Sequence, residues 1–397
     1  MKDRRQQGVV SLFIVMFTTI LLSVVAVGFL RLMLQEQKQA TNQDLSQSAY
    51  DSAMSGVEDA KRVLRMCAQG GEAGEQACEA IDSGSDKCDT VSAAGVVTGQ
   101  ADSTETIIKG ADGSGQRMQQ GYTCVIINPQ SPDFLGNIIG GESRLVALKA
   151  AGTNDIGRVS IEWMHKNSSG GSASYAGGET DDLQAPTIDP AVLLPQKSDW
   201  SPDAPALLRV QAVLPTDANK VTTADLDTSI NSTVYLRPAV ITQAGADLSV
   251  VLPPRSAGSA TTVSSSPMAV NCSKDKYDNG GYACKAVFQV SVPHESNVAF
   301  LRLTSLYRDT SIRVAMESGS GGAILFDGVQ PVVDSTGRAG NIFRRVSSRL
   351  NMSQFILPPA AINVTGSICK DFYLTEDIEA ISSGCRTYIS EDASSAP

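Results

Sequence analysis

One stretch of the sequence, SKDKYDNGG at residues 273–281, groups oxygen donors that could bind a metal ion. Asp275, Asp278 and Asn279 lie within one short loop, and carboxylate and amide oxygens are the ligands that Ca²⁺ prefers. The order of these residues lacks the alternating ligands and the closing glutamate of an EF-hand loop. Because Asp, Asn and Gly are also the usual residues of turns, an ordinary turn is favoured, and we predict no metal site.

A second stretch, GRAGNIFRRVSSRL at residues 337–350, gathers cations without any acidic residue. Its four arginines are Arg338, Arg344, Arg345 and Arg349. In a chain of net charge −10 this is a local basic patch, and such a patch could meet an acidic partner, a glycan or a phosphate. The favoured alternative is a solvated strand whose arginines pair with nearby carboxylates. The overall negative charge argues against general nucleic-acid binding.

The eight cysteines form the third group of reactive side chains. No CxxC motif occurs and there are only two histidines, so disulfides are favoured over a zinc site. Disulfides place the bulk of the chain outside the cytoplasm. Pairing between near neighbours is expected, although the sequence leaves the connectivity of the first four cysteines open: Cys67–Cys78, Cys88–Cys124, Cys272–Cys284 and Cys369–Cys385.

Motifs of enzymes are absent from the sequence. It contains no GxSxG, no HExxH, no phosphate-binding GxxxxGK[ST] and no GxGxxG before a helix, which are the signatures of common hydrolases and nucleotide-binding proteins. We therefore predict no catalytic residue, no cofactor and no enzymatic activity.

The elements that must position these groups begin with an apolar segment. No charged residue occurs from Val9 to Leu30. About 22 residues at about 1.5 Å each reach about 33 Å, enough to cross the hydrocarbon core of a bilayer. Basic residues dominate the short leader before this segment, which predicts a cytoplasmic N-terminus and a single-pass membrane protein.

The helix is predicted to continue beyond the membrane. Apolar or small residues recur every three or four positions, without an intervening proline, at Leu45, Ala49, Ala53, Val57, Ala60 and Leu64. This spacing forms one stripe on a helix. The glycines of QGG at Gln69–Gly71 are expected to end the helix. We expect one long helix, half in lipid and half packed on a globular domain.

Two parts of this helix resemble the type IV pilins and related pseudopilins. RRQQG followed by VVSLFIVMF is similar to their class III signal, and SAYDSAMSGVEDAKRVL resembles the helix of PilX-type minor pilins. The resemblance covers residues 1–65 and implies cleavage between Gly8 and Val9 by a prepilin peptidase, followed by methylation of the new N-terminus. It also implies that the helix packs among the helices of other pilins.

The chain departs from the family pattern at Phe13. Major pilins carry glutamate at this fifth mature position, where it pairs with the N-terminal amine of a neighbouring subunit. A subunit without this carboxylate resembles the tip pseudopilins that also lack it. This departure predicts a tip or priming position.

The rest of the chain is predicted to be rich in β-strands, which gives an α+β fold: a long helix packed on an antiparallel sheet, followed by a β-sandwich-like domain. A loop-rich region is expected over residues 68–120. A Gly/Ser-rich linker is expected to separate the two parts. The expected boundaries are a leader at 1–8, a transmembrane helix at 9–30, a helix and headpiece at 31–165, a linker at 166–206 and a β-rich domain at 207–397.

Together these observations favour a minor pilin-like structural subunit of a type IV pilus or a type II-like secretion filament. Its expected partners are other pilins, the prepilin peptidase, the membrane and a surface ligand of unknown type. The alternative is a membrane-anchored extracytoplasmic adhesion or glycan-binding protein that never enters a filament.

Overall fold

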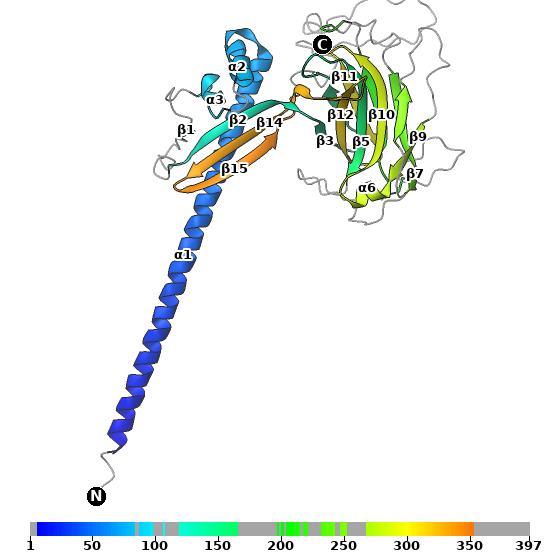
Figure 1. The fold of residues 1–397 in the computed structure, drawn as a ribbon. Helices are drawn as coiled ribbons and strands as arrows, with labels where there is room; N and C mark the ends of the chain where they lie inside the picture. The colour runs from blue at the N-terminus through cyan, green and yellow to red at the C-terminus, as the bar shows by residue number, and fades with distance from the viewer. Residues whose placement is uncertain are drawn as a thin grey trace, which may run out of the picture. The chain divides into compact units, whose positions relative to one another are not determined.

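The protein has an α+β fold, seen in a computed structural model (Figure 1). The structure describes residues 6–83, 87–97, 106–107, 119–165, 197, 200–201, 204–214, 217–220, 232–242, 247–251 and 267–352. The described helices are α1 (Gln6–Gln69), α2 (Gly71–Ser83), α3 (Thr90–Ala93) and α6 (Lys274–Asp278). Residues 353–397 lie outside the described residues.

Helix α1 is continuous, as its sequence predicts, and its second half packs on a sheet. In the predicted stripe, five of the six residues are buried: Ala49, Ala53, Val57, Ala60 and Leu64. Leu45, where the stripe begins, is half-buried. The helix ends at Gln69, and both following glycines have positive φ angles that other residues rarely adopt. The amphipathic pattern therefore predicted the buried face of this helix, and the glycines of QGG predicted its end.

The region after α1 is more helical than expected. Residues 68–120 were predicted to be rich in loops, but α2 follows α1 directly and α3 lies close behind it. Ala77, Ala80 and Ile81 of α2 are buried in the same core as Val57 and Val63 of α1. Their three- and four-residue spacing is that of one helix face. The abundance of Gly and Ser around α2 masked this short helical period.

A four-stranded sheet packs against the C-terminal half of α1 (Figure 1). Its order is β1-β2-β14-β15, with β1 (Thr106–Ile107), β2 (Gly121–Ser131), β14 (Phe326–Ala339) and β15 (Ile342–Arg349), and all three contacts are antiparallel. Two glycines make the contact with the helix close. A Cβ atom on Gly337 would overlap backbone atoms of Ala49 and Ala53, and one on Gly56 would overlap the side chain of Ser335. The small residues of α1 thus allow the helix to pack closely against β14 of this sheet.

Two further sheets pack face to face around the largest core (Figure 1). One has the order β13-β12-β5-β10-β8 with β3 paired to β12, and comprises β3 (Phe134–Ile138), β5 (Ile156–His165), β8 (Leu248–Val251), β10 (Tyr282–Val292), β12 (Thr310–Ser318) and β13 (Ala323–Ile324). The other has the order β4-β11-β6-β7-β9, with β4 (Ser143–Ala147), β6 (Leu207–Val213), β7 (Ser232–Thr242), β9 (Met268–Ser273) and β11 (Phe300–Leu306). Most strand contacts are antiparallel, but β8–β10 and β7–β9 are parallel.

The strand pairing divides the chain differently from the expected boundaries. Ser131 at the end of β2 and Phe326 at the start of β14 are register partners. The described residues between 132 and 325 therefore form a domain inserted between two neighbouring strands of the four-stranded sheet. The expected headpiece of 31–165 includes β3, β4 and β5, which belong to the inserted domain, whereas β14 and β15 complete the headpiece. We call residues 132–325 the inserted domain.

Part of the expected linker is packed rather than extended. Residues 166–196 lie outside the described residues. Trp200 is buried, and its ring stacks on that of Tyr307 with the ring centroids 4.7 Å apart. Trp163 of β5 donates a hydrogen bond of 3.0 Å to the backbone oxygen of Ala206. Trp200, Ala204 and Ala206 are therefore packed on the inserted domain.

This topology changes what is expected of a C-terminal fragment. The sequence boundaries suggest that residues 181–397 fold alone, but β5 lies between β10 and β12 in the centre of a sheet. We predict that the fragment 181–397 shows no cooperative thermal transition by circular dichroism. Full-length protein cut at a protease site placed within 170–178 should stay associated, because β5 remains paired on both edges. Dissociation of the cut protein, together with a cooperative melt of the fragment, would contradict this.

Candidate functional site

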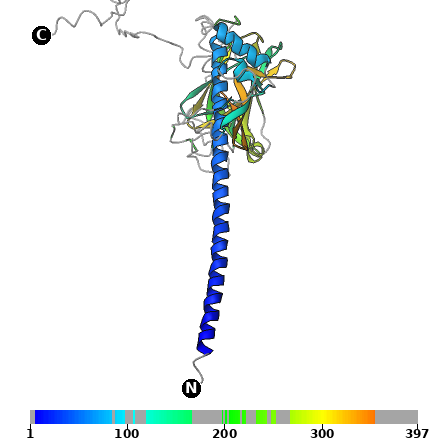
Figure 2. The same ribbon diagram turned by 90° about the vertical axis from the view of Figure 1, so that its left-hand side faces the viewer.

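The first candidate functional surface is the N-terminal half of α1. In both views it lies clear of every other described element (Figures 1 and 2). The large apolar side chains from Leu12 to Leu34 are about half or more exposed, and the helix is long and apolar enough to cross a membrane. An exposed apolar surface of this extent requires lipid or partner helices around it.

The polar side chains of this half are satisfied within the helix. The hydroxyls of Thr18, Thr19 and Ser23 each donate to a backbone oxygen three residues earlier, at 2.8–2.9 Å. Such bonds allow hydroxyl residues to lie in an apolar medium without an unmet donor. The segment is thus suited to lipid or to a helix bundle along its whole length.

The residues of the predicted processing site lie at the start of this helix. Gly8 and Val9 are within the helical backbone of α1. Phe13, at the position of the missing glutamate, is 59% exposed. The structure therefore leaves Phe13 available to lipid or to a neighbouring helix.

The second half of α1 holds a polar contact with the sheet. The hydroxyl of Tyr122 on β2 donates a 2.9 Å hydrogen bond to Asp59. Burial, with the charge of Asp59, raises the pKa of Tyr122 well above its usual value, so the hydroxyl stays protonated and able to donate. Arg62 pairs with the same carboxylate at 3.2 Å. An Asp59 contact thus fixes the rotation of the helix against the sheet.

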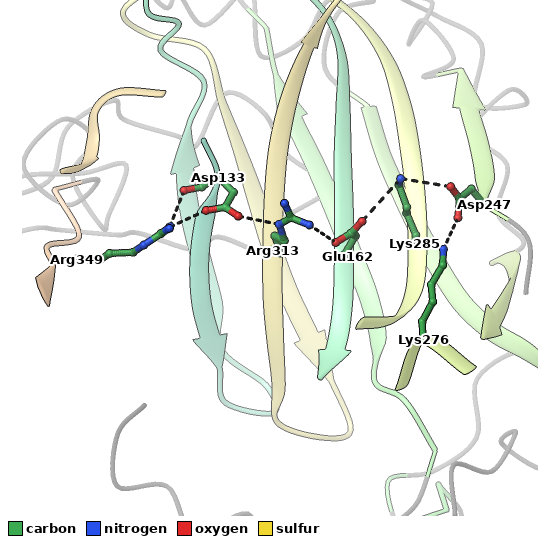
Figure 3. Close-up of polar contacts among 7 residues, drawn as sticks. All are labelled: Asp133, Glu162, Asp247, Lys276, Lys285, Arg313 and Arg349. Atoms are coloured by element: carbon green, nitrogen blue, oxygen red, sulfur yellow. Dashed lines mark hydrogen bonds and ion pairs between the residues drawn. The ribbon is translucent and has the colours of Figure 1, made fainter. Parts of the chain in front are cut away.

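A row of alternating charges crosses the outer face of the six-stranded sheet and is the most extensive polar arrangement of the described residues (Figure 3). In order it contains Arg349, Asp133, Arg313, Glu162, Lys285, Asp247 and Lys276. These residues come from different elements, since Arg313, Glu162 and Lys285 lie on β12, β5 and β10. Adjacent strands carry opposite charges, which is the stabilising arrangement for cross-strand pairs.

Asp133 is the residue that joins the inserted domain to the headpiece. Its side chain is only 11% exposed, and it binds Arg349 of β15 at 2.6 Å and Arg313 of β12 at 2.8 Å. Arg349 also donates to the backbone oxygen of Asp133 at 3.2 Å. Nearby, the side-chain amide of Gln330 on β14 exchanges two hydrogen bonds with the backbone of Leu135, at 2.9 and 2.7 Å. Two sets of polar contacts therefore clamp the point where the chain enters the inserted domain.

The charges along the row reinforce one another. Partial burial acts to lower the pKa of Arg313, but its hydrogen bond to Asp133 and the charge of Glu162 outweigh that effect and raise the pKa. At the other end, burial opposes the charged form of Asp247, but Lys276 and Lys285 hold its pKa below the ordinary value. Both groups therefore stay charged over the physiological range of pH.

The predicted basic patch is largely paired in the structure. Arg345 makes a two-pronged contact with Asp334 on the neighbouring strand β14, at 2.5 and 2.6 Å. Arg349 belongs to the clamp on Asp133, and Arg344 donates to the hydroxyl of Ser46 on α1 at 2.7 Å. Arg338 also has a polar partner. These contacts hold the hairpin β14–β15 in place. They agree with the favoured interpretation of this stretch as a strand whose arginines pair with nearby groups.

Three of the four expected cysteine pairs are confirmed. The described disulfides are Cys67–Cys78, Cys88–Cys124 and Cys272–Cys284. Cys67–Cys78 ties α2 to the end of α1, and Cys88–Cys124 ties the segment before α3 to β2. Cys369 and Cys385 lie outside the described residues. The disulfides therefore support the headpiece and the inserted domain separately.

The stretch with candidate calcium ligands forms a short helix and a turn. Asp275 and Asp278 lie in α6, whose N-cap Ser273 accepts a bond from the backbone of Lys276. Asp278 pairs with Lys274 at 3.2 Å, and the side chain of Asn279 donates to the backbone of Asp275 at 2.9 Å. The side chains of Asp278 and Asn279 therefore stabilise α6 and the turn that follows it.

A small cluster of titratable side chains beside the start of β5 and the end of β10 was not predicted from the sequence. Asp155, His294 and Glu295 place their oxygen and nitrogen atoms within 4.8 Å of one another. The imidazole Nδ1 of His294 lies 3.0 Å from Asp155 and 3.1 Å from Glu295. Hydrogen bonds from His294 lower the pKa of Asp155. Because 139 residues separate Asp155 from His294 in the chain, local spacing gave no signal for this cluster.

Comparison with known proteins identifies no relative. No protein-family model matches the chain, and neither a curated protein nor a solved structure is significantly similar to it. The functional argument therefore depends on the sequence and the geometry described above.

Proposed function

We propose that the protein is a minor pilin-like structural subunit of a type IV pilus or a type II-like secretion filament. The observation that carries the proposal is the division of one continuous helix, α1, into two halves. The first half exposes apolar side chains on all sides, and the second half is buried on a four-stranded antiparallel sheet. A helix built in this way anchors a headpiece in the membrane before assembly and packs among other helices afterwards.

The leader supports the same proposal. A short basic segment ends in Gly8, and the uncharged segment begins at Val9. This junction resembles the site at which a prepilin peptidase cleaves. Cleavage there would remove the charges of the leader, and charged side chains are unfavourable inside an apolar helix bundle.

Phe13 supports a position at the tip rather than in the shaft. A carboxylate at this place attracts the amine of a subunit that is already in the filament, and phenylalanine has no such attraction. The inserted domain of 132–325 adds bulk to the headpiece that the repeating subunit of a shaft would have to accommodate at every step. We propose that the subunit primes or caps the filament and displays the inserted domain.

Localisation in filaments tests this function. Immunogold labelling of sheared filaments should mark filament ends and leave the shaft unlabelled. Replacing Gly8 with leucine should leave an uncleaved precursor in the membrane and remove the end label. Gly28→Ala is the matched control, because Gly28 lies in the apolar segment that follows Gly8 and no other group lies within 4 Å of its Cβ position.

Two results would separate the parts of this proposal. Regular labelling along the wild-type shaft would contradict the tip position and leave the pilin assignment intact. Normal processing and localisation of the Gly8→Leu protein would contradict the pilin assignment itself and favour an ordinary membrane anchor.

A further inference from the structure

Strand β15 forms one edge of the four-stranded sheet (Figure 1). Among the described residues it pairs with β14 alone. No residue of β15 is buried, whereas the second half of β14 buries every other residue. The described part of the chain therefore leaves the outer edge of β15 uncovered, and an uncovered edge is a template for a further strand.

The hydrogen bonding of β15 shows which of its backbone groups point to this edge. Its register with β14 is regular from Ile342 to Arg349. Just after β15 the amide of Leu350 donates to the backbone oxygen of Pro331 at 2.9 Å. Because hydrogen-bonded and non-hydrogen-bonded pairs alternate along two antiparallel strands, the even-numbered residues of β15 bond to β14. The backbone groups that point outward are those of Phe343, Arg345, Ser347 and Arg349.

Two exposed aromatic rings flank this edge, one on each side of β15. Arg344 donates to Ser46 on α1, so Phe343, its neighbour in the strand, points to the face away from the helix. Tyr50 lies one turn beyond Ser46 on the same face of α1. Phe343 is 56% exposed and Tyr50 is 45% exposed. Outside the apolar half of α1, the described residues expose two other large apolar side chains, Ile139 and Leu325.

The charges of β15 select the kind of partner. The strand carries three arginines and no acidic residue. Asp334 and Asp133 pair with Arg345 and Arg349, and the third arginine, Arg344, donates to a hydroxyl of α1. Like charges directly opposite each other destabilise a strand pair, so pairing with β15 of a second copy is unfavourable. Arginines can protect an edge from any strand, but that role does not require exposed aromatic rings on both sides.

We propose that the free edge of β15 binds an extended, acidic segment of another protein as a fifth strand of the sheet. The backbone groups of Phe343, Arg345 and Ser347 pair with this segment. Its side chains cover the rings of Phe343 and Tyr50, and its carboxylates meet the arginines of the strand. In this mode of recognition main-chain hydrogen bonds supply the affinity and side chains supply the specificity.

This inference goes beyond the proposed function and does not rest on it. Strand β15 belongs to the headpiece, and a peptide can bind to its edge without a filament. Failure of peptide binding would leave the pilin proposal intact, and failure of the pilin proposal would leave the edge of β15 available.

The test uses the purified full-length chain in detergent, with a fluorescent peptide of alternating valine and glutamate as the probe. We expect saturable binding, measured by fluorescence anisotropy, that weakens as salt is raised. The same peptide with N-methylated amides should not bind, because it cannot pair with the backbone of β15. A peptide of alternating valine and lysine should bind about tenfold more weakly or less, because like charges then oppose each other.

Two variants locate the binding edge. Ser347→Pro removes an amide that points outward and keeps the hydrogen bonds to β14, a change that edge strands accept, and it should weaken peptide binding about tenfold. Phe343→Ala should weaken binding about fivefold, the effect of one aromatic cross-strand contact. Ile139→Ala is the matched control, because Ile139 is 52% exposed and follows β3 in the inserted domain. It should bind the peptide as the wild type does.

The proposal is overturned if the glutamate peptide does not bind, if the N-methylated peptide binds equally well, or if the lysine peptide is preferred. It is also overturned if Phe343→Ala binds the glutamate peptide as tightly as the wild type does. Analytical ultracentrifugation of the full-length chain completes the test. A dimer that dissociates in the Phe343→Ala protein would show that the edge pairs with a second copy, which contradicts an acidic partner.

Discussion

Replacement of Gly337 by valine is expected to destabilise the headpiece by about 3 kcal/mol or more, the upper end of the cost of overpacking. A side chain at this position would occupy the space of backbone atoms of Ala49 and Ala53 on α1. Backbone atoms of a long helix cannot rotate away as a side chain can, so β14 would have to move off the helix. The cost is purely steric, because Gly337 does not have a positive φ angle and valine otherwise favours strands.

Hydrogen exchange measured along the chain tests this expectation. Amides of β2, β14 and β15 should lose protection in Gly337→Val, while amides of β5 and β10 in the inserted domain keep it. Gly319→Ala is the control, because nothing lies within 4 Å of a Cβ atom at that position. If the amides of β14 keep wild-type protection in the Gly337→Val protein, the close packing of α1 against β14 at this position is contradicted.

Replacement of Asp133 by alanine is expected to cost about 3 kcal/mol, the lower end of the range for breaking a buried ion pair. Asp133 binds both Arg313 and Arg349, and its removal takes the carboxylate partner from Arg349 and leaves Arg313 with Glu162 as its counter-charge. The cost stays at the lower end because water still reaches the two arginines, whose side chains are 41% and 33% exposed.

Denaturant unfolding of Asp133→Ala, Arg349→Ala and the double variant measures the coupling of this pair. The double variant should be less destabilised than the sum of the two single variants, because no unpaired charge remains at Arg349. The control is Asp334→Ala, whose partner Arg345 is 71% exposed and which should cost less than about 1 kcal/mol. Equal effects of Asp133→Ala and Asp334→Ala would contradict a clamp at Asp133.

The sequence predicted the features of this fold that depend on local spacing. The four-residue recurrence of Ala49, Ala53 and Val57 identified the buried face of α1, because a helix brings such residues to one side. The short loops between neighbouring cysteines indicated Cys272–Cys284. The uncharged run before Arg31 indicated a helix able to span a membrane.

Features that depend on distant pairing could not be predicted in this way. Thr123 on β2 donates to Thr336 on β14 although 213 residues separate them, and nothing in either strand specifies the other. The expected boundary near residue 165 followed a change in composition, whereas the real division follows the pairing of Ser131 with Phe326. The role of Asp133 could not be predicted from local sequence either, because its partners Arg313 and Arg349 are 180 and 216 residues away.

The central claim is that the protein is a processed, pilin-like subunit, and the mass of its N-terminal peptide tests this most directly. Mature protein should be isolated from membranes or sheared filaments, digested and analysed by mass spectrometry. The claim predicts a peptide that begins at Val9 and carries a methyl group on its terminal amine. A protein that retains residues 1–8, or one cleaved at another position, would contradict it.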